Sequence, residues 1–567
     1  MFNMMTFRKM CALAIRLATA FAAPSVDAPT VDLGYAKYYG NSNTTLGLKT
    51  FFGIPYAEPP IGDLRWRAPV PLSRNSTVKS TEAINATTVG PQCVQGRSAW
   101  LPQTDAPDPA SEDCLLINVW APLNPVADYL PVVVNLHGGG FIAGNGSQEP
   151  GQNLVPYSNG AIVYLSVQYR LGAYGFLPGS AIRDGGVLNA GLLDQRLALE
   201  WVQQNIHAFG GDPKQVTIWG GSAGGASVLY QLTWKGGETN PPFRSAIPEY
   251  LAVSSFKNET TQEAMYNTLL NAANCTSLDC LRGKTFEELR NVTQQSYLDA
   301  FDAGLYGYGD SYYQPVVDGS FIRDVPSQQL AHGNFSRVPI LVDTDEFEGI
   351  GFTNFSVKTA NDVKREFNRF FLNATPEFLD GLLDLYPLSE FGEAWLDSNN
   401  LFQSPVYEFG LVPLIAQYGA ILEKNNTAGW ANQAILGDFY IHCPARYVAS
   451  AAFNQSLKVP IWKLRFNAGY FAHAAVGRYI LGPTESPLIF NKTLSYIMKD
   501  WYLSFVINQD PNFPLPTRDN SSRPWFPQYG AESTVVHVNE TSISYIADPD
   551  DSARCEYFQA NVEITQN

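Results

Sequence analysis

The sequence predicts an α/β protein with a large, mostly parallel central sheet flanked by helices. Several short apolar runs rich in valine and isoleucine are continuous rather than alternating, as in strands buried on both faces. Helical stretches lie between these runs, and strands that alternate with helices form a parallel sheet covered on both sides. The expected strands are 131–136, 161–167, 215–219, 338–342 and 459–466.

Helices are expected between the strands and throughout the middle of the chain. A leucine-rich stretch at 191–206 reads as a helix that precedes the third strand. The regions 250–335 and 355–430 carry helical patterns such as 363–371 and 378–385, without a strong strand run. We interpret them as helical insertions that cap one end of the sheet. Since no repeat or Pro/Ser-rich linker divides the chain, residues 23–567 are expected to form a single domain.

Composition and charge exclude several classes of protein. The 567 residues are 45% hydrophobic and 16% charged, which is a globular balance. A net charge of −16 argues against nucleic acid as a partner, because phosphates attract a basic face. Beyond the N-terminus no run of about 18 apolar residues occurs, so no membrane span is expected.

The N-terminus has the pattern of a secretory signal. Arg8 and Lys9 precede a mostly apolar stretch, and Ala20-Phe21-Ala22 resembles a small-x-small cleavage site. Residues 1–22 are therefore predicted to be a signal peptide of a secreted protein, although Arg16 interrupts the apolar stretch. A transit peptide, or a start codon placed too early, is the alternative interpretation.

Glycosylation sequons and cysteines agree with export. The density of Asn-x-Ser/Thr sequons predicts N-linked glycans on exposed loops. The sequons include Asn43, Asn75, Asn85, Asn145, Asn258, Asn274, Asn291, Asn334, Asn354, Asn373, Asn454, Asn491 and Asn539. Six cysteines follow the expected signal peptide, and an even number in a secreted chain favours disulfides. Closure of short loops favours Cys93–Cys114 and Cys275–Cys280. Cys443 and Cys555 then form a third disulfide or remain free buried thiols.

A glycine-flanked serine is the strongest local signal. Ser222 lies in the pentapeptide Gly-Gly-Ser-Ala-Gly (220–224), directly after an expected strand and before a helix start at 225–230. Strand, sharp turn and helix form the context of a nucleophile elbow, in which flanking glycines avoid collisions and leave the serine Oγ exposed. Ser222 is thus predicted to be a nucleophile.

A glycine triplet supplies the second signal. His137 and Gly138–Gly140 follow the strand that ends at Leu136. No phosphate-binding or dinucleotide-binding glycine motif is present, which disfavours a phosphate cradle. Beside a serine elbow, the triplet fits an oxyanion hole with N–H donors from Gly139, Gly140 and Ala223.

Longer motifs surround these two signals. They are Gly53–Gly62, Leu64–Trp66, Ser111–Leu115, Tyr169–Gly172, Gly175–Leu177, Asn189–Arg196 and Phe209–Pro213. Together with the glycine triplet and the serine turn, they resemble the type-B carboxylesterase/lipase family, which includes cholinesterases and secreted fungal esterases and lipases. The resemblance is dense over the first 230 residues and sparse afterwards, and it implies the α/β-hydrolase fold.

The resemblance also implies a Ser–Glu–His triad in that chain order. Alignment on the glycine and phenylalanine that follow selects Glu348 as the acid, with Glu346 as the alternative. His473, in a short loop after the strand 459–466, is selected as the base. The other histidines are His137 and His207, which lie near the glycine triplet and before the elbow, and His332, His442 and His537, which read as surface or packing residues.

The family pattern further implies two buried ion pairs, Arg65–Glu112 and Arg170–Asp194. Two residues of this chain differ from the family pattern and change the charge expected near the serine. Gly221 and Val476 replace residues that are often acidic in the family. Their absence disfavours cationic choline esters, and Trp100 lies at the wrong spacing to be a choline-contacting aromatic.

The loop between Cys93 and Cys114 bears on the choice between esterase and lipase. Its only apolar pair is Trp100-Leu101, beside Pro102, Asp105, Pro107, Asp108, Pro109 and Glu112. Such a loop buries little apolar surface on lipid, so an esterase for neutral, relatively soluble esters is preferred. The alternatives are a lipase for long-chain glycerides or sterol esters, and a biosynthetic esterase or lactone-forming enzyme.

The expected reaction is acyl transfer to water through an acyl-enzyme on Ser222, and it needs no metal or organic cofactor. Some relatives keep the fold as adhesion proteins without the serine. Because this chain retains the serine and candidates for the acid and the base, an enzyme is expected.

Overall fold

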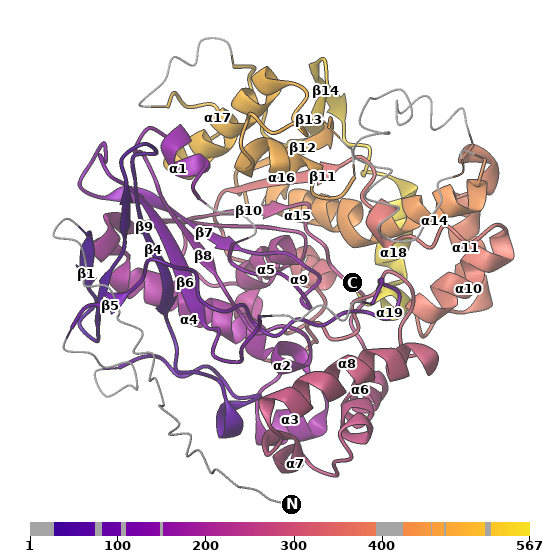
Figure 1. Cartoon of the computed structure of the whole chain (residues 1–567). Coiled ribbons are helices and arrows are strands. Elements are labelled where there is room, and N and C mark those ends of the chain that lie inside the picture. Colours follow the sequence, from indigo (N-terminus) through magenta and orange to yellow (C-terminus); the bar gives the residue numbers. More distant parts are fainter. Residues whose placement is uncertain are drawn as a thin grey trace, which may run out of the picture.

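The computed structural model describes residues 28–567 except 74–81, 104–108, 148–150, 393–422, 424, 455, 470–471 and 516–522. The predicted signal peptide, Asn75 and part of the Cys93–Cys114 loop therefore lie outside the described residues. An 11-stranded sheet forms the centre of the molecule, in the order β14-β13-β12-β11-β10-β9-β7-β8-β6-β4-β3 (Figure 1).

Its strands are β3 (Asn41–Asn43), β4 (Leu48–Pro55), β6 (Leu116–Pro122), β7 (Leu130–Leu136), β8 (Val163–Val167), β9 (Gly211–Gly221), β10 (Ser245–Glu249), β11 (Ile340–Asp345), β12 (Ile461–Asn467), β13 (Thr534–Asn539) and β14 (Ile543–Ala547). A small separate sheet contains β1 (Thr30–Asp32), β2 (Lys37–Tyr39) and β5 (Ile84–Asn85).

The middle of the large sheet is parallel and its edges are antiparallel. Strands β8, β7, β9, β10, β11, β12 and β13 pair in parallel. Strands β6, β4 and β3 continue one side with antiparallel pairing, and β14 closes the other side. Every residue of β7, β8 and β11 is buried, which explains why most residues of β7 and β8 and the first three residues of β11 are apolar.

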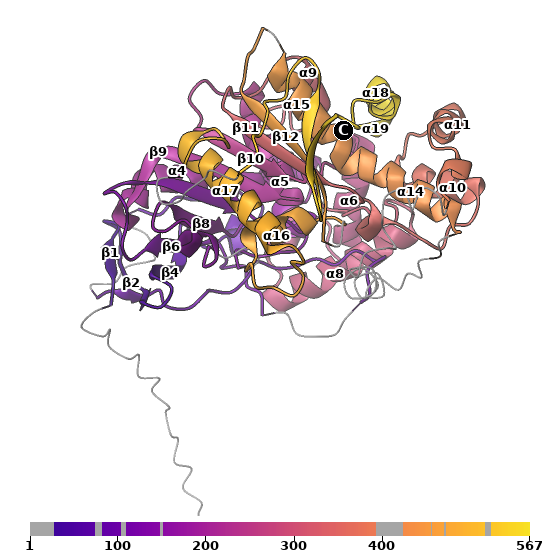
Figure 2. The same cartoon turned by 90° about the horizontal axis from the view of Figure 1, so that it is seen from above.

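Helices cover both faces of the sheet (Figure 2). They are α1 (Leu154–Tyr157), α2 (Gly172–Phe176), α3 (Ser180–Gly185), α4 (Ala190–Asn205), α5 (Ala223–Leu232), α6 (Glu259–Ala272), α7 (Leu278–Arg282), α8 (Phe286–Asp302), α9 (Pro326–Ala331), α10 (Ala360–Phe370), α11 (Pro376–Leu385), α14 (Thr427–Gly437), α15 (Cys443–Phe453), α16 (Ala475–Leu481), α17 (Lys492–Asn508), α18 (Ala553–Ala560) and α19 (Val562–Thr565).

The middle of the chain is helical, as predicted. Helices α6, α7 and α8 and helices α10 and α11 lie together beside the sheet (Figure 1). Capping boxes explain two of their starts: Thr285 and Glu288 cap α8, and Thr359 and Asp362 cap α10. The remainder of the predicted second insertion, residues 393–422, lies outside the described residues. No helix in the described part of the chain is long and apolar enough to cross a membrane.

Candidate active site

Ser222 occupies a strained turn between β9 and α5. Its backbone has φ 60° and ψ −125°, outside the regions that non-glycine residues normally adopt. Three backbone hydrogen bonds hold it: Ser222 N donates to Glu249 O (3.1 Å), and Ser222 O accepts from Ala226 N (2.9 Å) and Ala252 N (3.0 Å). Such strain persists when the surroundings enforce it, and it is typical of functional residues.

The glycines around Ser222 are required because the turn leaves no space for side chains. A Cβ at Gly224 would lie 1.9 Å from the carbonyl oxygen of Leu136. A Cβ at Gly221 would lie 2.1 Å from the hydroxyl oxygen of Tyr250. The packing of Tyr250 therefore explains why position 221 has no acidic side chain here.

His473 joins Ser222 to Glu348. His473 Nε2 lies 2.8 Å from Ser222 Oγ, and its Nδ1 lies 2.6 Å from Glu348 Oε2. Glu348 is fully buried, whereas Ser222 and His473 are partly exposed. The three residues follow β9, β11 and β12, whose carboxyl ends meet at one edge of the parallel sheet.

Glu346 points away from this chain of hydrogen bonds. Its carboxylate accepts a hydrogen bond from Arg465 Nε at 2.8 Å. Burial is the largest single influence and raises the pKa of Glu346, but the charge and hydrogen bond of Arg465, together with His442 and His537, outweigh burial and lower the pKa. The structure thus brings Glu348, and not Glu346, to His473.

Asp345 connects the segments that carry Glu348 and His473, a role that sequence reasoning missed. Its backbone N–H donates to Glu348 Oε1 at 2.6 Å. Its buried carboxylate accepts from Ala475 N (3.0 Å) and Val476 N (2.9 Å), the first turn of the helix after His473. Burial and the neighbouring Glu348 raise the pKa of Asp345 well above its usual range.

A second buried acid lies on the same strand. Asp343 accepts from Tyr250 N (2.9 Å) and from the hydroxyl of Tyr502. Burial raises the pKa of Asp343, and the nearby charge of Glu348 acts in the same direction. Two acids on one strand end are visible in the sequence, but no sequence pattern indicates that they lie behind the histidine.

The glycine triplet lies against the serine turn, as expected. A Cβ at Gly138 would lie 3.1 Å from Ser222 Cβ, which shows how closely the two loops approach. Gly139 (φ 110°) and Gly140 (φ 62°) adopt conformations that favour glycine, and Ala223 is the first residue of α5. The glycine triplet and the first residue of α5 therefore approach the serine turn from two sides in the sequence.

His137 packs against the glycine triplet. It is buried, its ring stacks on Tyr169 at 4.3 Å, and its Nδ1 lies 2.9 Å from Gly138 O. Burial lowers the pKa of His137 to about 4. The ring is neutral at physiological pH, so Nδ1 carries the hydrogen that it donates to Gly138 O.

Aromatic side chains form the walls around His473. The rings of Tyr250 and Phe352 each lie 5.1 Å from the imidazole in edge-to-face contact. Trp100 is a packing residue: its ring lies 4.9 Å from that of Tyr308, and its Nε1 donates to Asp310 O at 2.8 Å. Two aromatic rings therefore flank the imidazole.

The predicted disulfides and ion pairs are all present. Cysteines 93 and 114, 275 and 280, and 443 and 555 are bonded. Arg65 binds Glu112 through two hydrogen bonds of 2.7 and 2.5 Å, and Arg170 binds Asp194 through bonds of 2.8 and 2.7 Å. All four side chains are buried.

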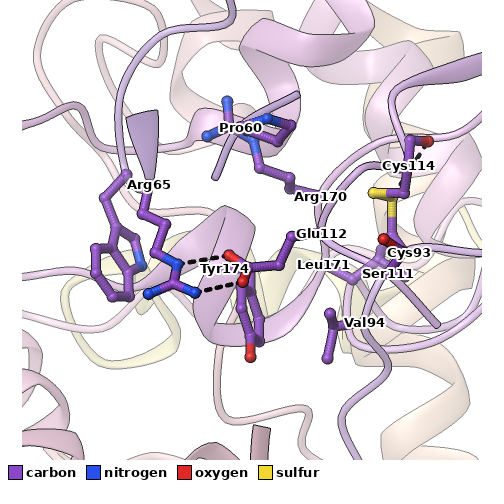
Figure 3. Close-up of a pocket in the computed structure, with 11 residues that line it drawn as sticks. Pro60, Arg65, Cys93, Val94, Ser111, Glu112, Cys114, Arg170, Leu171 and Tyr174 are labelled. Atoms are coloured by element: carbon purple, nitrogen blue, oxygen red, sulfur yellow. Dashed lines mark hydrogen bonds and ion pairs between the residues drawn. A yellow bond between two sulfur atoms is a disulfide. The ribbon is translucent and has the colours of Figure 1, made fainter. Parts of the chain in front are cut away.

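Figure 3 shows the pocket around the first ion pair, beside the Cys93–Cys114 disulfide. None of the residues that line it belongs to the Ser222–His473–Glu348 chain. This pocket is therefore a feature of the scaffold and is separate from the candidate active site. Elsewhere in the described residues, no cluster of three or more His, Cys, Asp or Glu side chains could hold a metal ion.

A parallel sheet that carries a strained serine on a strand–turn–helix defines the class of α/β-hydrolases. Within that class, residues 27–557 match the carboxylesterase family, and the chain belongs to this family. It is a serine carboxylic ester hydrolase.

Similar proteins cover nearly the whole chain. Secreted lipase 1 of Botryotinia fuckeliana is 31% identical over 598 aligned residues, which are 96% of this chain and 97% of that protein. Carboxylesterase patB of Aspergillus clavatus is 27% identical and covers 96% of this chain and 98% of its own length. The crystal structure of Aspergillus niger EstA superimposes with a TM-score of 0.79 at 29% identity, covering 95% of this chain and 99% of that one.

Proposed function

We propose that the protein is a secreted carboxylic ester hydrolase that uses Ser222, His473 and Glu348 as its catalytic triad. The observation that carries this proposal is the unbroken chain of hydrogen bonds from buried Glu348 through His473 to Ser222 Oγ. A serine hydroxyl becomes a strong nucleophile when a positioned imidazole accepts its proton.

In the first half of the reaction, His473 Nε2 takes the proton as Ser222 Oγ attacks the ester carbonyl. The N–H groups of Gly139, Gly140 and Ala223 stabilise the oxyanion of the tetrahedral intermediate. Glu348 accepts the Nδ1 hydrogen and stabilises the imidazolium. The intermediate collapses, the alcohol leaves with the proton from His473, and the acyl group stays on Ser222.

Water completes the cycle. It attacks the acyl-enzyme while His473 accepts its proton, and the released acid restores Ser222. Asp345 and the glycine triplet Gly138–Gly140 hold their positions before substrate binds. The hydrogen-bond donors of the site therefore need little rearrangement when the transition state forms.

The substrate class follows from the charge and surface at the site. Gly221 and Val476 carry no charge, and Tyr250 and Phe352 flank the base. These features favour neutral esters over choline esters. One relative is named as a lipase and another as a carboxylesterase, so the names of the relatives support both the lipase and the esterase alternative. We favour relatively soluble esters, because the Cys93–Cys114 loop has a single apolar pair.

Secretion is supported by the surface of the molecule. Each predicted sequon asparagine within the described residues is at least partly exposed, and Asn43, Asn258, Asn274 and Asn373 are among the exposed ones. Three disulfides are typical of proteins from oxidising compartments. The relative from Botryotinia fuckeliana is named as secreted.

Hydrolysis of p-nitrophenyl esters from acetate to palmitate tests the proposal, with Ser222→Ala beside the wild type and with or without detergent micelles. We expect turnover of short-chain esters that is indifferent to micelles and abolished by the substitution. Activity confined to long chains and raised by micelles would favour the lipase alternative. Equal activity of the Ser222→Ala variant would overturn the proposed nucleophile.

A further inference from the structure

His442 lies behind the triad and contacts two oxygen atoms. It belongs to η7 (Asp438–His442), a π-helical turn between α14 and α15. Its Nδ1 lies 2.8 Å from Asp438 Oδ1, and its Nε2 lies 2.9 Å from the carbonyl oxygen of Asp345. The side chain is only 6% exposed.

The two contacts together indicate the protonation state of His442. A backbone carbonyl oxygen only accepts hydrogen bonds, and so does an ionised carboxylate. Both ring nitrogens must therefore donate, which requires the doubly protonated imidazolium. The second carboxylate oxygen, Asp438 Oδ2, accepts a hydrogen bond from the Tyr386 hydroxyl at 2.7 Å, so each oxygen of this carboxylate has a hydrogen-bond partner.

Charged groups on neighbouring elements surround this histidine. Burial and the positive charge of Arg465, from β12, oppose protonation, whereas the Asp550 and Asp438 carboxylates favour it. Glu346, from the end of β11, adds a further negative charge. The balance raises the pKa of His442 above its ordinary value. The other charged groups on adjoining helices have their own partners: Arg446 of α15 binds Asp551 and lies near Glu556 of α18, and Arg554 lies over the Tyr386 ring.

The contact between His442 and the Asp345 carbonyl matters because Asp345 also contacts the candidate acid and the helix after the candidate base. The same residue donates its N–H to Glu348 and binds the first turn of α16 through its carboxylate. His442 therefore anchors the residue that sets the relative position of the acid and of the segment after the base.

We propose that His442 is a positioning residue whose imidazolium fixes the Asp345 backbone and thereby keeps Glu348 aligned with His473. This inference rests on the proposed triad. When His442 loses its proton, one of its two hydrogen bonds is lost and the acid segment loosens. Activity is expected to fall as pH rises through the raised pKa of His442, which gives the pH profile a descending limb.

The test is the pH dependence of kcat and KM for hydrolysis of p-nitrophenyl butyrate. The variants are His442→Gln, which removes the titrating group, and Asp438→Asn, which removes its counter-charge. His332→Gln is the matched control, because His332 is exposed. We expect His442→Gln to lower kcat at neutral pH by about tenfold to a hundredfold with KM within about twofold, and to abolish the descending limb.

Asp438→Asn keeps the histidine and is expected to move the descending limb to lower pH, while His332→Gln leaves the profile unchanged. Descending limbs identical to that of the wild type in both His442→Gln and Asp438→Asn would overturn the proposal. If His442→Gln does not fold, the Asp438→Asn profile decides alone. Nitrogen shifts of the 15N-histidine-labelled wild type provide a separate measurement: a neutral His442 ring at pH 6 would also overturn the proposal.

The failure of this inference is distinguishable from failure of the proposed function. Loss of activity in Ser222→Ala establishes the nucleophile whatever His442 does. A wild type that hydrolyses esters, with a pH profile independent of His442 and Asp438, would leave the triad intact and remove His442 from the positioning role.

Discussion

Glu346 and Glu348 are separated by one residue but have different partners. Glu348 contacts His473, whereas Glu346 contacts Arg465. We expect Glu348→Gln to lower kcat by about 10³- to 10⁴-fold, because the amide no longer stabilises the imidazolium or its tautomer. Steady-state hydrolysis of p-nitrophenyl butyrate measures this loss.

The matched control is Glu346→Gln. It is expected to keep kcat within about tenfold but to lower the free energy of unfolding by about 1–3 kcal/mol, because Arg465 loses a charged hydrogen-bond partner. Urea unfolding measures the change in stability. The reverse pattern, with activity lost in Glu346→Gln and kept in Glu348→Gln, would transfer the acid role to Glu346.

The buried His137, next to the glycine triplet, makes the stability of the folded protein depend on pH. Its pKa is about 4 in the folded protein, below the ordinary value of 6.5. The unfolded chain therefore binds a proton in this range that the folded protein does not. The free energy of unfolding is expected to fall by about 3 kcal/mol as pH decreases from about 6.5 to about 4.

Urea unfolding at a series of pH values checks this expectation. His137→Gln should lose less stability over the range than the wild type, and His332→Gln should follow the wild type. Parallel curves for His137→Gln and the wild type would show that another group causes the acid sensitivity.

Some residues of the site were predictable because their role leaves a local pattern. Ser222 is flanked by glycines for steric reasons, and Gly349 and Phe352 mark the position of Glu348. Asp345 leaves no such pattern, because its role depends on backbone hydrogen bonds between segments 130 residues apart.

At the scale of elements, two disulfides close loops of very different length. Cys275–Cys280 spans 5 residues beside α7, and Cys443–Cys555 spans 112 residues and joins α15 to α18. Loop-closure entropy predicts that removal of the long-range disulfide costs about 4–5 kcal/mol of stability and removal of the short one about 2 kcal/mol. Thermal unfolding of the two double Cys→Ala variants measures the difference. A larger effect of the short loop would indicate that native-state packing, and not chain entropy, dominates.

Strands were predicted where the sequence has a continuous apolar run, and β6 and β10 were missed although every residue of each is buried. The runs at β7, β8, β9, β11 and β12 were found within a few residues of their bounds. Strand β10 was missed because Pro248 and Glu249 interrupt its apolar character, although all five of its residues are buried. Because β10 was not predicted, the sequence also did not indicate that Tyr250, which follows this strand, packs against His473.

At the scale of the whole molecule, the site combines two parts of the chain that differ in how much the sequence reveals. The motif-rich first 230 residues supply the glycine loop and Ser222. The second half has few motifs but supplies Glu348 and His473 from the ends of β11 and β12. The parallel order of the sheet brings both parts to one edge, which explains why sparse motifs there still located the two residues.

The most direct test of the central claim is mass spectrometry of the protein after reaction with a p-nitrophenyl alkylphosphonate. An activated serine displaces p-nitrophenolate and forms a stable phosphonyl ester. The account predicts one adduct per molecule, located by peptide mapping on Ser222 and absent from Ser222→Ala. An adduct on another residue, or equal labelling of the Ser222→Ala variant, would contradict the assignment of Ser222 as the nucleophile.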